Sequence, residues 1–161
     1  TGALCRCVVA KNSASARATT KAARKIAESR ETMALTATQL ALSVQRRAQL
    51  VRVCAAFPQV DVEVVGDQHL AFRINKKTFA YYLFDHHGDG RIAFCFKSNL
   101  SEQRRQVRDD PEDFFVPPYL GSKGWIAIRL DSGEVDWEIV TDFARRAYQA
   151  LAPRKLAALV E

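Results

Sequence analysis

The spacing of apolar residues along this chain changes near residue 60, from a helical period to a period of two. Between Thr36 and Ala56 apolar residues recur every three or four positions, which predicts a helix that ends before Phe57-Pro58. Alternation of apolar and polar residues then predicts strands over residues 61–65, 69–74, 78–84 and 91–97. The connections between them are short, and short connections favour an antiparallel meander.

Helical spacing returns in the second half of the chain. Ser98 or Ser101 is predicted to cap a helix that ends near Asp110-Pro111, and residues 111–115 are predicted to add one short helical turn. The remaining expected elements are a strand over 124–130, a helix that Asp136 caps, and a tail helix over 155–160. This order predicts an α+β fold of two layers, in which helices pack on one side of an antiparallel sheet.

Composition separates residues 1–32 from the predicted domain, residues 33–161. The nine Phe, two Trp and four Tyr residues all lie at or after Phe57, so the first 32 residues have little apolar surface to bury. We consider three interpretations of this basic segment. It is an upstream extension of a gene that starts at Met33, an organelle-targeting leader, or a functional basic arm.

Most of the net charge of +6 belongs to this leader, which holds seven of the 24 Lys and Arg residues and two of the 18 Asp and Glu residues. Two of the four cysteines, Cys5 and Cys7, also lie there, while Cys54 and Cys95 fall in apolar patterns. Such spacing is typical of neither a disulfide framework nor a zinc site. No apolar run reaches the roughly 20 residues of a membrane-spanning helix. These features predict a cytoplasmic protein without a cofactor or metal.

One face of the predicted sheet repeats a pattern of small residues with a cation at one end. The alternation assigns to this face His69-Ala71-Arg73, Arg91-Ala93-Cys95-Lys97 and Trp125-Ala127-Arg129. Two interpretations are open. The face is a shallow groove for a polyanion, with a floor of Ala and Cys, or it is a solvated face whose cationic side chains cover apolar surface with their stems.

Three short motifs also allow two interpretations each. His86-His87 is a metal-binding pair or turn material, and the acidic residues of 109–113 are a metal or acid/base site or a solvated helix end. Gly121-Ser122-Lys123-Gly124 holds a phosphate through converging N–H groups, or it is a tight connection into the next strand. His69 is expected to close a hydrogen bond at the end of the sheet.

The chain resembles the MmcQ/YjbR family. The resemblance is carried by motifs that extend over residues 57–157, and the Pro-Pro-Tyr-x-Gly-x-Lys-Gly-Trp block is the most specific of them. These motifs are His69-x-x-Phe72-Arg73, Lys77-x-Phe79-Ala80, Asp89-Gly90-Arg91 with Lys97, FFVPPYLGSKGW from Phe114, Val135-Asp136-Trp137, and Tyr148 before Ala152-Pro153-Arg154-Lys155-Leu156. The chain has Ala147 where the family often has Ser.

The resemblance implies a compact fold similar to secretion chaperones and a DNA-binding role through a double-wing arrangement, with no catalytic residues. We therefore expect a small nucleic-acid-binding protein, a monomer or weak dimer, that is not an enzyme. The candidate phosphate contacts are Arg73, Lys97, Lys123 and Arg129, with Trp125 or Tyr119 stacking nearby. The alternatives are a protein-interaction or chaperone-like adaptor, which uses the same sheet face or the Pro117-Pro118-Tyr119 corner, and an enzyme or small-ligand binder at the Lys123 loop.

Overall fold

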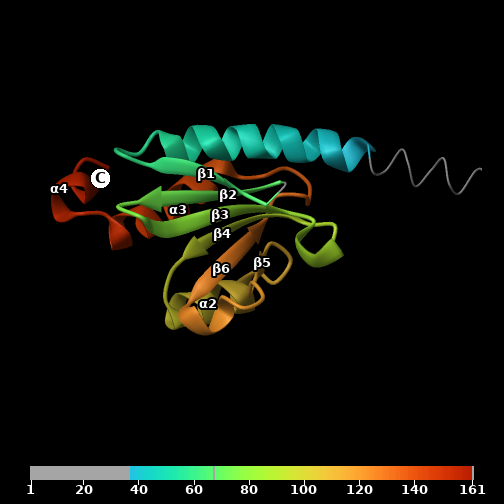
Figure 1. Cartoon of the computed structure of the whole chain (residues 1–161). Coiled ribbons are helices and arrows are strands. Elements are labelled where there is room, and N and C mark those ends of the chain that lie inside the picture. The colour runs from blue at the N-terminus through green and yellow to red at the C-terminus, as the bar shows by residue number, and fades with distance from the viewer. Residues whose placement is uncertain (1–36, 67, 161) are drawn as a thin grey trace, which may run out of the picture. The chain divides into compact units, whose positions relative to one another are not determined.

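The protein is described from a computed structural model, which covers residues 37–66 and 68–160 (Figure 1). The expectations for the leader of residues 1–32, with Cys5 and Cys7, lie outside this range, as does Thr36, the first residue of the predicted first helix. Within the described range, the chain from Ala41 onward forms one compact unit. None of the described helices is long and apolar enough to cross a lipid bilayer.

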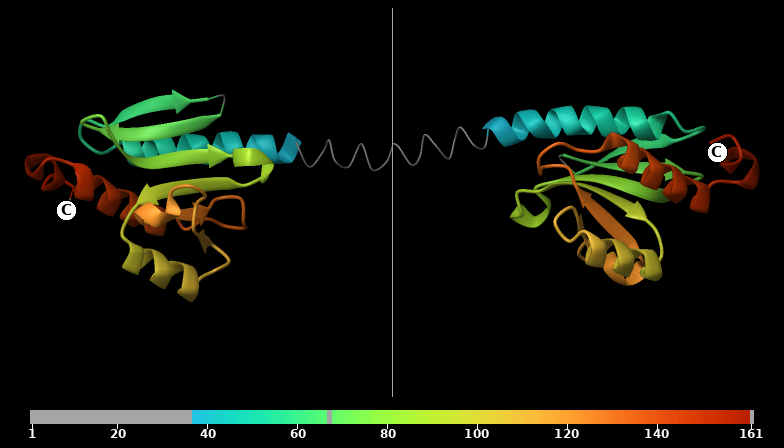
Figure 2. Two further views of the ribbon diagram at one scale, coloured as in Figure 1. Left: turned by 60° about the horizontal axis from the view of Figure 1, so that its bottom comes forward. Right: turned by 180° about the vertical axis from the view of Figure 1, so that it is seen from behind.

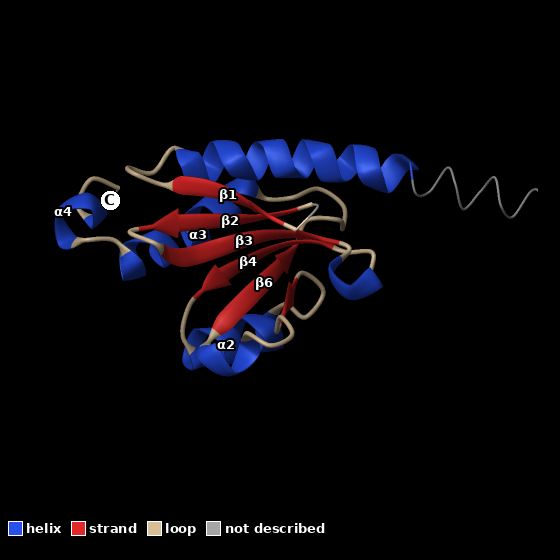
Figure 3. Ribbon diagram, in the orientation of Figure 1, coloured by secondary structure: helices blue, strands red, loops and turns tan. Residues whose placement is uncertain are grey.

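Six strands form one antiparallel sheet in the order β1-β2-β3-β4-β6-β5 (Figures 1 and 3). Their bounds are β1 (Asp61–Val65), β2 (His69–Ile74), β3 (Lys77–Phe84), β4 (Ile92–Lys97), β5 (Phe114–Phe115) and β6 (Trp125–Arg129). The five strands expected from alternation are confirmed, because a period of two places every second side chain in the core. The predicted α+β class is also confirmed.

The short strand β5 replaces the second half of the helical turn expected over residues 111–115. Phe114 pairs with Ile128 and Phe115 with Ala127, and the Arg129 N–H donates to the Asp113 carbonyl at 2.8 Å. Successive residues of a strand point to opposite faces. Phe114 therefore enters the main core while Phe115 packs against the other face of the sheet, which a helical turn would not allow.

The helices comprise residues 37–55, α2 (Leu100–Asp109), α3 (Trp137–Leu151) and α4 (Arg154–Ala157), with short 3₁₀ turns η1 (His86–Gly88) and η2 (Gly121–Lys123). Asp136 caps α3 as expected, by accepting hydrogen bonds from the N–H groups of Glu138 and Ile139. The cap of α2 is Asn99, whose side chain accepts a hydrogen bond from the Glu102 N–H. The expected cap, Ser98 or Ser101, is therefore wrong. The tail helix α4 is shorter than predicted.

The main core lies between the sheet and two helices, residues 41–55 and α3, which cover the same face (Figure 2). Two tyrosine hydroxyls tie these layers together. Tyr82 of β3 donates to the Ser43 carbonyl at 2.9 Å, and Tyr148 of α3 donates to the Pro58 carbonyl at 2.8 Å. Both rings are buried, so each hydroxyl needs such a partner.

The opposite face of the sheet carries a second, smaller core, which corrects both interpretations of that face. Ala93, Cys95 and Ala127 are buried there together with Trp125. Phe115, Leu120, Tyr81 and Leu83 pack against them. The small residues expected as a groove floor are therefore neither open to a ligand nor solvated. They are small because the segment after β5 packs closely over them.

Candidate nucleic-acid interface

Lys97 and Lys123 meet at one end of this second face. Lys97 is the last residue of β4 and pairs in register with Trp125, the first residue of β6. Its ammonium donates a hydrogen bond to the main-chain carbonyl of Lys123. The Lys123 side chain is exposed. Two of the four predicted phosphate contacts are thus brought together by the pairing of β4 with β6.

The Gly121–Gly124 loop is a tight connection into β6, and its N–H groups do not form the expected phosphate cradle. The Lys123 N–H donates to Leu120, and the Gly124 N–H donates to Gly121, both at 3.0 Å. Gly124 has φ +78, and a Cβ there would lie 2.9 Å from the Cα of Asn99. Only glycine fits this left-handed position without displacing the backbone next to α2.

Gln103 of α2 holds this loop through side-chain hydrogen bonds. The sequence analysis did not identify it. Its buried amide nitrogen donates to the carbonyls of Gly121 (2.8 Å) and Trp125 (2.6 Å). A glutamine on a helix that is otherwise polar gives no signal of its own in the sequence. Its role depends on α2 lying against the start of β6.

Arg73 and Arg129 do not join the two lysines. Arg73 forms an ion pair with Glu63 of β1 at 2.9 Å, and Arg129 forms one with Asp131 at 3.3 Å, which raises the Arg129 pKa. Arg129 pairs with Ala93, four residues from Lys97 along β4. At ~3.3 Å per residue this places Arg129 about 13 Å from the lysine end. Arg129 therefore lies at the opposite end of the face. Arg73 pairs with Thr78 at the start of β3, so it lies at the lysine end, but its guanidinium is held by Glu63.

The two aromatic candidates differ sharply in accessibility. Trp125 is only 6% exposed and packs on Tyr81, with ring centroids 5.3 Å apart. Tyr119 is 82% exposed and lies in the left-handed region at φ 63. Trp125 therefore belongs to the second core, while Tyr119 presents its ring to solvent.

A groove beside Lys97 adds residues that the sequence reasoning missed. It has a volume of about 410 Å³ and is lined by Lys97, Ser98, Asn99, Glu102, Arg146, Ala150 and Leu151. We call it the cationic groove. Asp142 is shared by Arg145 and Arg146, so two cations meet one carboxylate. The Arg145-Arg146 pair is visible in the sequence, but its proximity to Lys97 arises only when α3 packs on the sheet.

Glu102 is the acidic residue of the cationic groove, and it is held by its own helix. It accepts hydrogen bonds from Arg105 (2.7 Å) and from the Gln106 side chain (2.9 Å). These bonds lower the pKa of Glu102. The carboxylate is thus largely neutralised by α2 itself, and Lys97 remains available for an anion.

The histidines form a row of rings. His86 lies 4.1 Å from His87 and 5.2 Å from His69 between centroids, and His87 lies 5.6 Å from Tyr119. His69 accepts the Phe84 N–H through Nδ1, as expected for a residue that closes the end of the sheet. Over residues 37–66 and 68–160, no group of three side chains is arranged to hold a metal ion.

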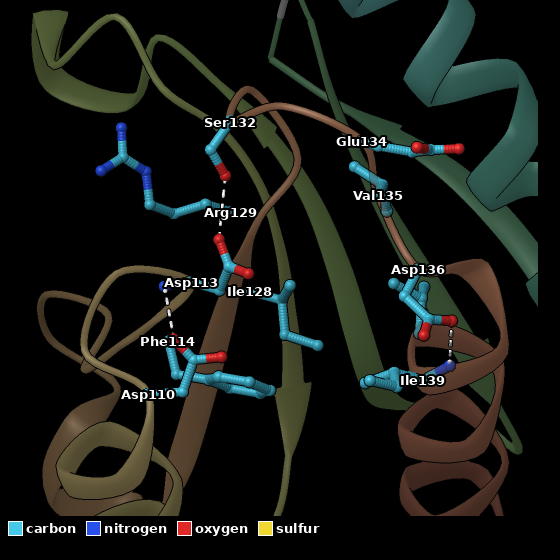
Figure 4. A pocket seen from close by; sticks show the side chains of 11 residues that line it. Asp110, Asp113, Phe114, Ile128, Arg129, Ser132, Glu134, Val135, Asp136 and Ile139 are labelled. Atoms are coloured by element: carbon cyan, nitrogen blue, oxygen red, sulfur yellow. Dashed lines mark hydrogen bonds between the residues drawn. The ribbon is translucent and has the colours of Figure 1, made fainter.

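The acidic residues after α2 line a small cavity of about 60 Å³, shown in Figure 4. Asp113 accepts a hydrogen bond from the Ser132 hydroxyl at 3.0 Å, and Asp110 accepts one from the Asp113 N–H at 3.3 Å. Asp136 faces them from the start of α3, while Arg129 extends to the side away from Asp136 (Figure 4). These carboxylates close the turn between α2 and β5, which favours the structural interpretation of the acidic cluster.

Comparisons with known proteins agree with this description. Residues 55–150 match the YjbR family. The fold is similar to the crystal structure of Deinococcus radiodurans protein DR2400, a protein with a DUF419 domain, at a TM-score of 0.54 and 19% identity. That match covers 69% of this chain and 81% of the other. No curated protein matches the chain by sequence.

Proposed function

The chain belongs to the YjbR family, and we propose that it is a small nucleic-acid-binding protein that contacts phosphates with Lys97, Lys123 and Arg146. The observation that carries this proposal is the hydrogen bond from Lys97 to the Lys123 carbonyl. It holds the Lys97 ammonium against the main chain of Lys123, and Lys97 lines the cationic groove together with Arg146. We place the phosphate contacts here and not on the centre of the sheet face.

Charge balance supports this placement. Arg73 and Arg129 each have a carboxylate partner, so an incoming phosphate would have to compete with Glu63 or Asp131. At the groove, Lys97 donates to a neutral carbonyl. Arg146 also has a carboxylate partner, Asp142, but it shares that carboxylate with Arg145, so two guanidinium groups meet one negative charge. Phosphate contacts by lysine and arginine supply most non-specific affinity for nucleic acids. The groove therefore has the stronger electrostatic attraction.

The start of α2 adds to this attraction. Asn99 caps the helix at the wall of the groove, beside Ser98. The first N–H groups of a helix carry a partial positive charge, and anions bind near them. A phosphate held by Lys97 lies close to this helix end.

We propose binding without catalysis, in a reducing cytoplasm. Both cysteines of the described chain are free and buried, and burial raises the pKa of the Cys95 thiol to about 12. Such a thiol is protonated at neutral pH and is a poor nucleophile. Free buried thiols are also typical of proteins kept in a reducing compartment.

The test is fluorescence anisotropy with duplex and single-stranded DNA over a salt series, with the full chain and with residues 33–161. The double variant Lys97→Ala, Lys123→Ala should weaken binding and reduce the slope of log affinity against log salt by about 2 on duplex DNA. The matched control is the double variant Arg73→Ala, Arg129→Ala, which also removes two cations, each of them paired with a carboxylate. An equal effect of both variants would contradict the proposed groove. Binding that disappears in residues 33–161 would assign it to the leader.

A protein-interaction adaptor is the second candidate function, and the exposed edge of the sheet favours it. All five residues of β1 are exposed, and Val64, on the core side, is 58% exposed. An open edge strand can pair with a strand of another chain. Sedimentation over a concentration series tests self-pairing. A dimer that Val64→Lys abolishes would support this function, and a monomer at all concentrations would remove self-pairing.

A further inference from the structure

An apolar pocket opens on the second face of the sheet, away from the cationic groove. Its volume is about 180 Å³, and its lining is almost entirely apolar. The strands and η1 contribute Val65, His69, Tyr81, Leu83 and His86, and the corner after β5 contributes Pro117, Pro118, Tyr119 and Leu120. An apolar cavity of about 150 Å³ accepts a benzene ring. The pocket thus has room for one small flat ring.

The residues at the mouth of this pocket hold unfavourable backbone conformations. Tyr119 has φ 63, His87 φ 62 and Asp85 φ 49, although none of them is glycine. The rings of Tyr119 and His87 touch at 5.6 Å between centroids. Left-handed conformations cost free energy in residues with a side chain, and they concentrate at binding sites. Here they keep a large aromatic ring, 82% exposed, at the entrance.

Cations stand beside the pocket. The Arg91 carbonyl accepts the Asp85 N–H at 2.8 Å, which places Arg91 next to the η1 wall. Its guanidinium lies 5.0 Å from the centre of the Phe115 ring. Arg129 is in the same row of the sheet as Leu83, because both residues pair with Ala93, but its guanidinium is held by Asp131. Arg91 is therefore the cation that this inference uses. The occupant should therefore join a flat apolar face to an anionic chain.

We propose that this pocket receives one unpaired base of a single-stranded nucleic acid, which stacks on Tyr119. The inference rests on the proposed function and names its ligand. A lining of rings and prolines accepts a base by stacking, and stacking is tolerant of sequence because every base has a π-face. The pocket lies on the same face of the sheet as Lys97. Leu83 in the pocket pairs with Ala93, which is four residues, or about 13 Å, from Lys97 along β4. A short strand reaches both the pocket and the cationic groove.

The experiment measures anisotropy of the full chain with a single strand of roughly twelve nucleotides, a length within the site sizes of single-strand binders. A strand of the same length without bases and a duplex serve as comparisons. Tyr119→Ala should weaken binding of the base-bearing strand by on the order of tenfold, and Tyr119→Phe should restore it. Binding of the abasic strand should be equal in all three proteins. Because Tyr119 is exposed, the variants keep the core, and near-ultraviolet circular dichroism checks the fold.

The outcomes separate this inference from the proposed function. Equal binding of base-bearing and abasic strands, or tighter binding of the duplex, would overturn the base pocket and leave the phosphate contacts standing. If the wild-type protein binds none of these nucleic acids, both the base pocket and the phosphate contacts are wrong. A further experiment adds N-acetyl-tryptophanamide, which stands in for an aromatic side chain of a protein partner, and measures whether it stabilises the protein. If it stabilises the wild type but not Tyr119→Ala, and base-bearing strands do not displace it, the occupant is a protein and the inference is wrong.

Discussion

The side chain of Gln103 donates a hydrogen bond of 2.6 Å to the main-chain carbonyl of Trp125. Its second bond, to the Gly121 carbonyl, fixes both ends of the loop that carries Lys123. This buried amide on α2, together with the bond from the Ser98 N–H to the Gly124 carbonyl, holds the loop next to the end of β4. The proposed phosphate contacts depend on this position.

Replacement of Gln103 by leucine should lower the free energy of unfolding by about 1–3 kcal/mol, because the buried Trp125 carbonyl loses its donor. The Gly121 carbonyl still accepts the Gly124 N–H. Urea denaturation measures this loss. Gln106→Leu is the matched control on the same helix, since the Gln106 side chain donates to Glu102 of its own helix, and it should cost about 1 kcal/mol. Equal losses in the two variants would show that the Gln103 bonds contribute no more to the free energy of unfolding than the Gln106 bond does.

Gly124→Ala should destabilise the protein far more than Gly133→Ala. Both glycines have positive φ, but a Cβ at Gly124 meets the Asn99 backbone at 2.9 Å, while one at Gly133 meets nothing within 4 Å. The conformational cost alone is about 1–2 kcal/mol, and the clash should raise it to about 3 kcal/mol or more at Gly124. Thermal melts of the two variants compare these costs. Similar melting temperatures would contradict the close approach of the loop to α2.

Stability should fall at alkaline pH through Tyr82. Burial raises its pKa to about 12, against about 10 in an unfolded chain. Between these values the unfolded state releases the proton and the native state keeps it, so the free energy of unfolding decreases as pH rises. Tyr82→Phe should cost about 1 kcal/mol near pH 8, where the bond to Ser43 is lost. It should also show a shallower alkaline decline. Urea titrations from neutral to alkaline pH measure both effects, and parallel declines would contradict the role of Tyr82.

Cys95 should resist alkylation in the native protein. Burial, and to a lesser degree the charge of Asp89, raise the pKa of its thiol to about 12, and burial also raises the pKa of Cys54. Iodoacetamide attacks the thiolate, which is scarce at pH 8. Peptide mass spectrometry should find both residues unmodified in the native protein and labelled after unfolding. Rapid native labelling of Cys95 would show that the segment over the second core opens readily.

Most of the helices and strands, and the residues of the main core, can be read from the amino-acid sequence. The alternation of Leu70, Phe72 and Ile74, and the helical stripe that includes Val140 and Ala144, fix which faces are buried, because burial of apolar side chains follows the period of each element. The motif around Pro117-Pro118 indicated the family. The capping role of Asp136 was also readable, since it acts on its immediate neighbours.

Tertiary structure alone decided the candidate site. Ala93 and Cys95 look like an open floor in the sequence, yet the segment carrying Leu120 covers them. Arg73 looks like a free cation until β1 places Glu63 beside it. Arg146 reaches the groove only because α3 packs on the sheet. Local spacing reports which side of an element is apolar, whereas charge pairing and coverage depend on residues far away in the chain, and only the packed fold brings these together.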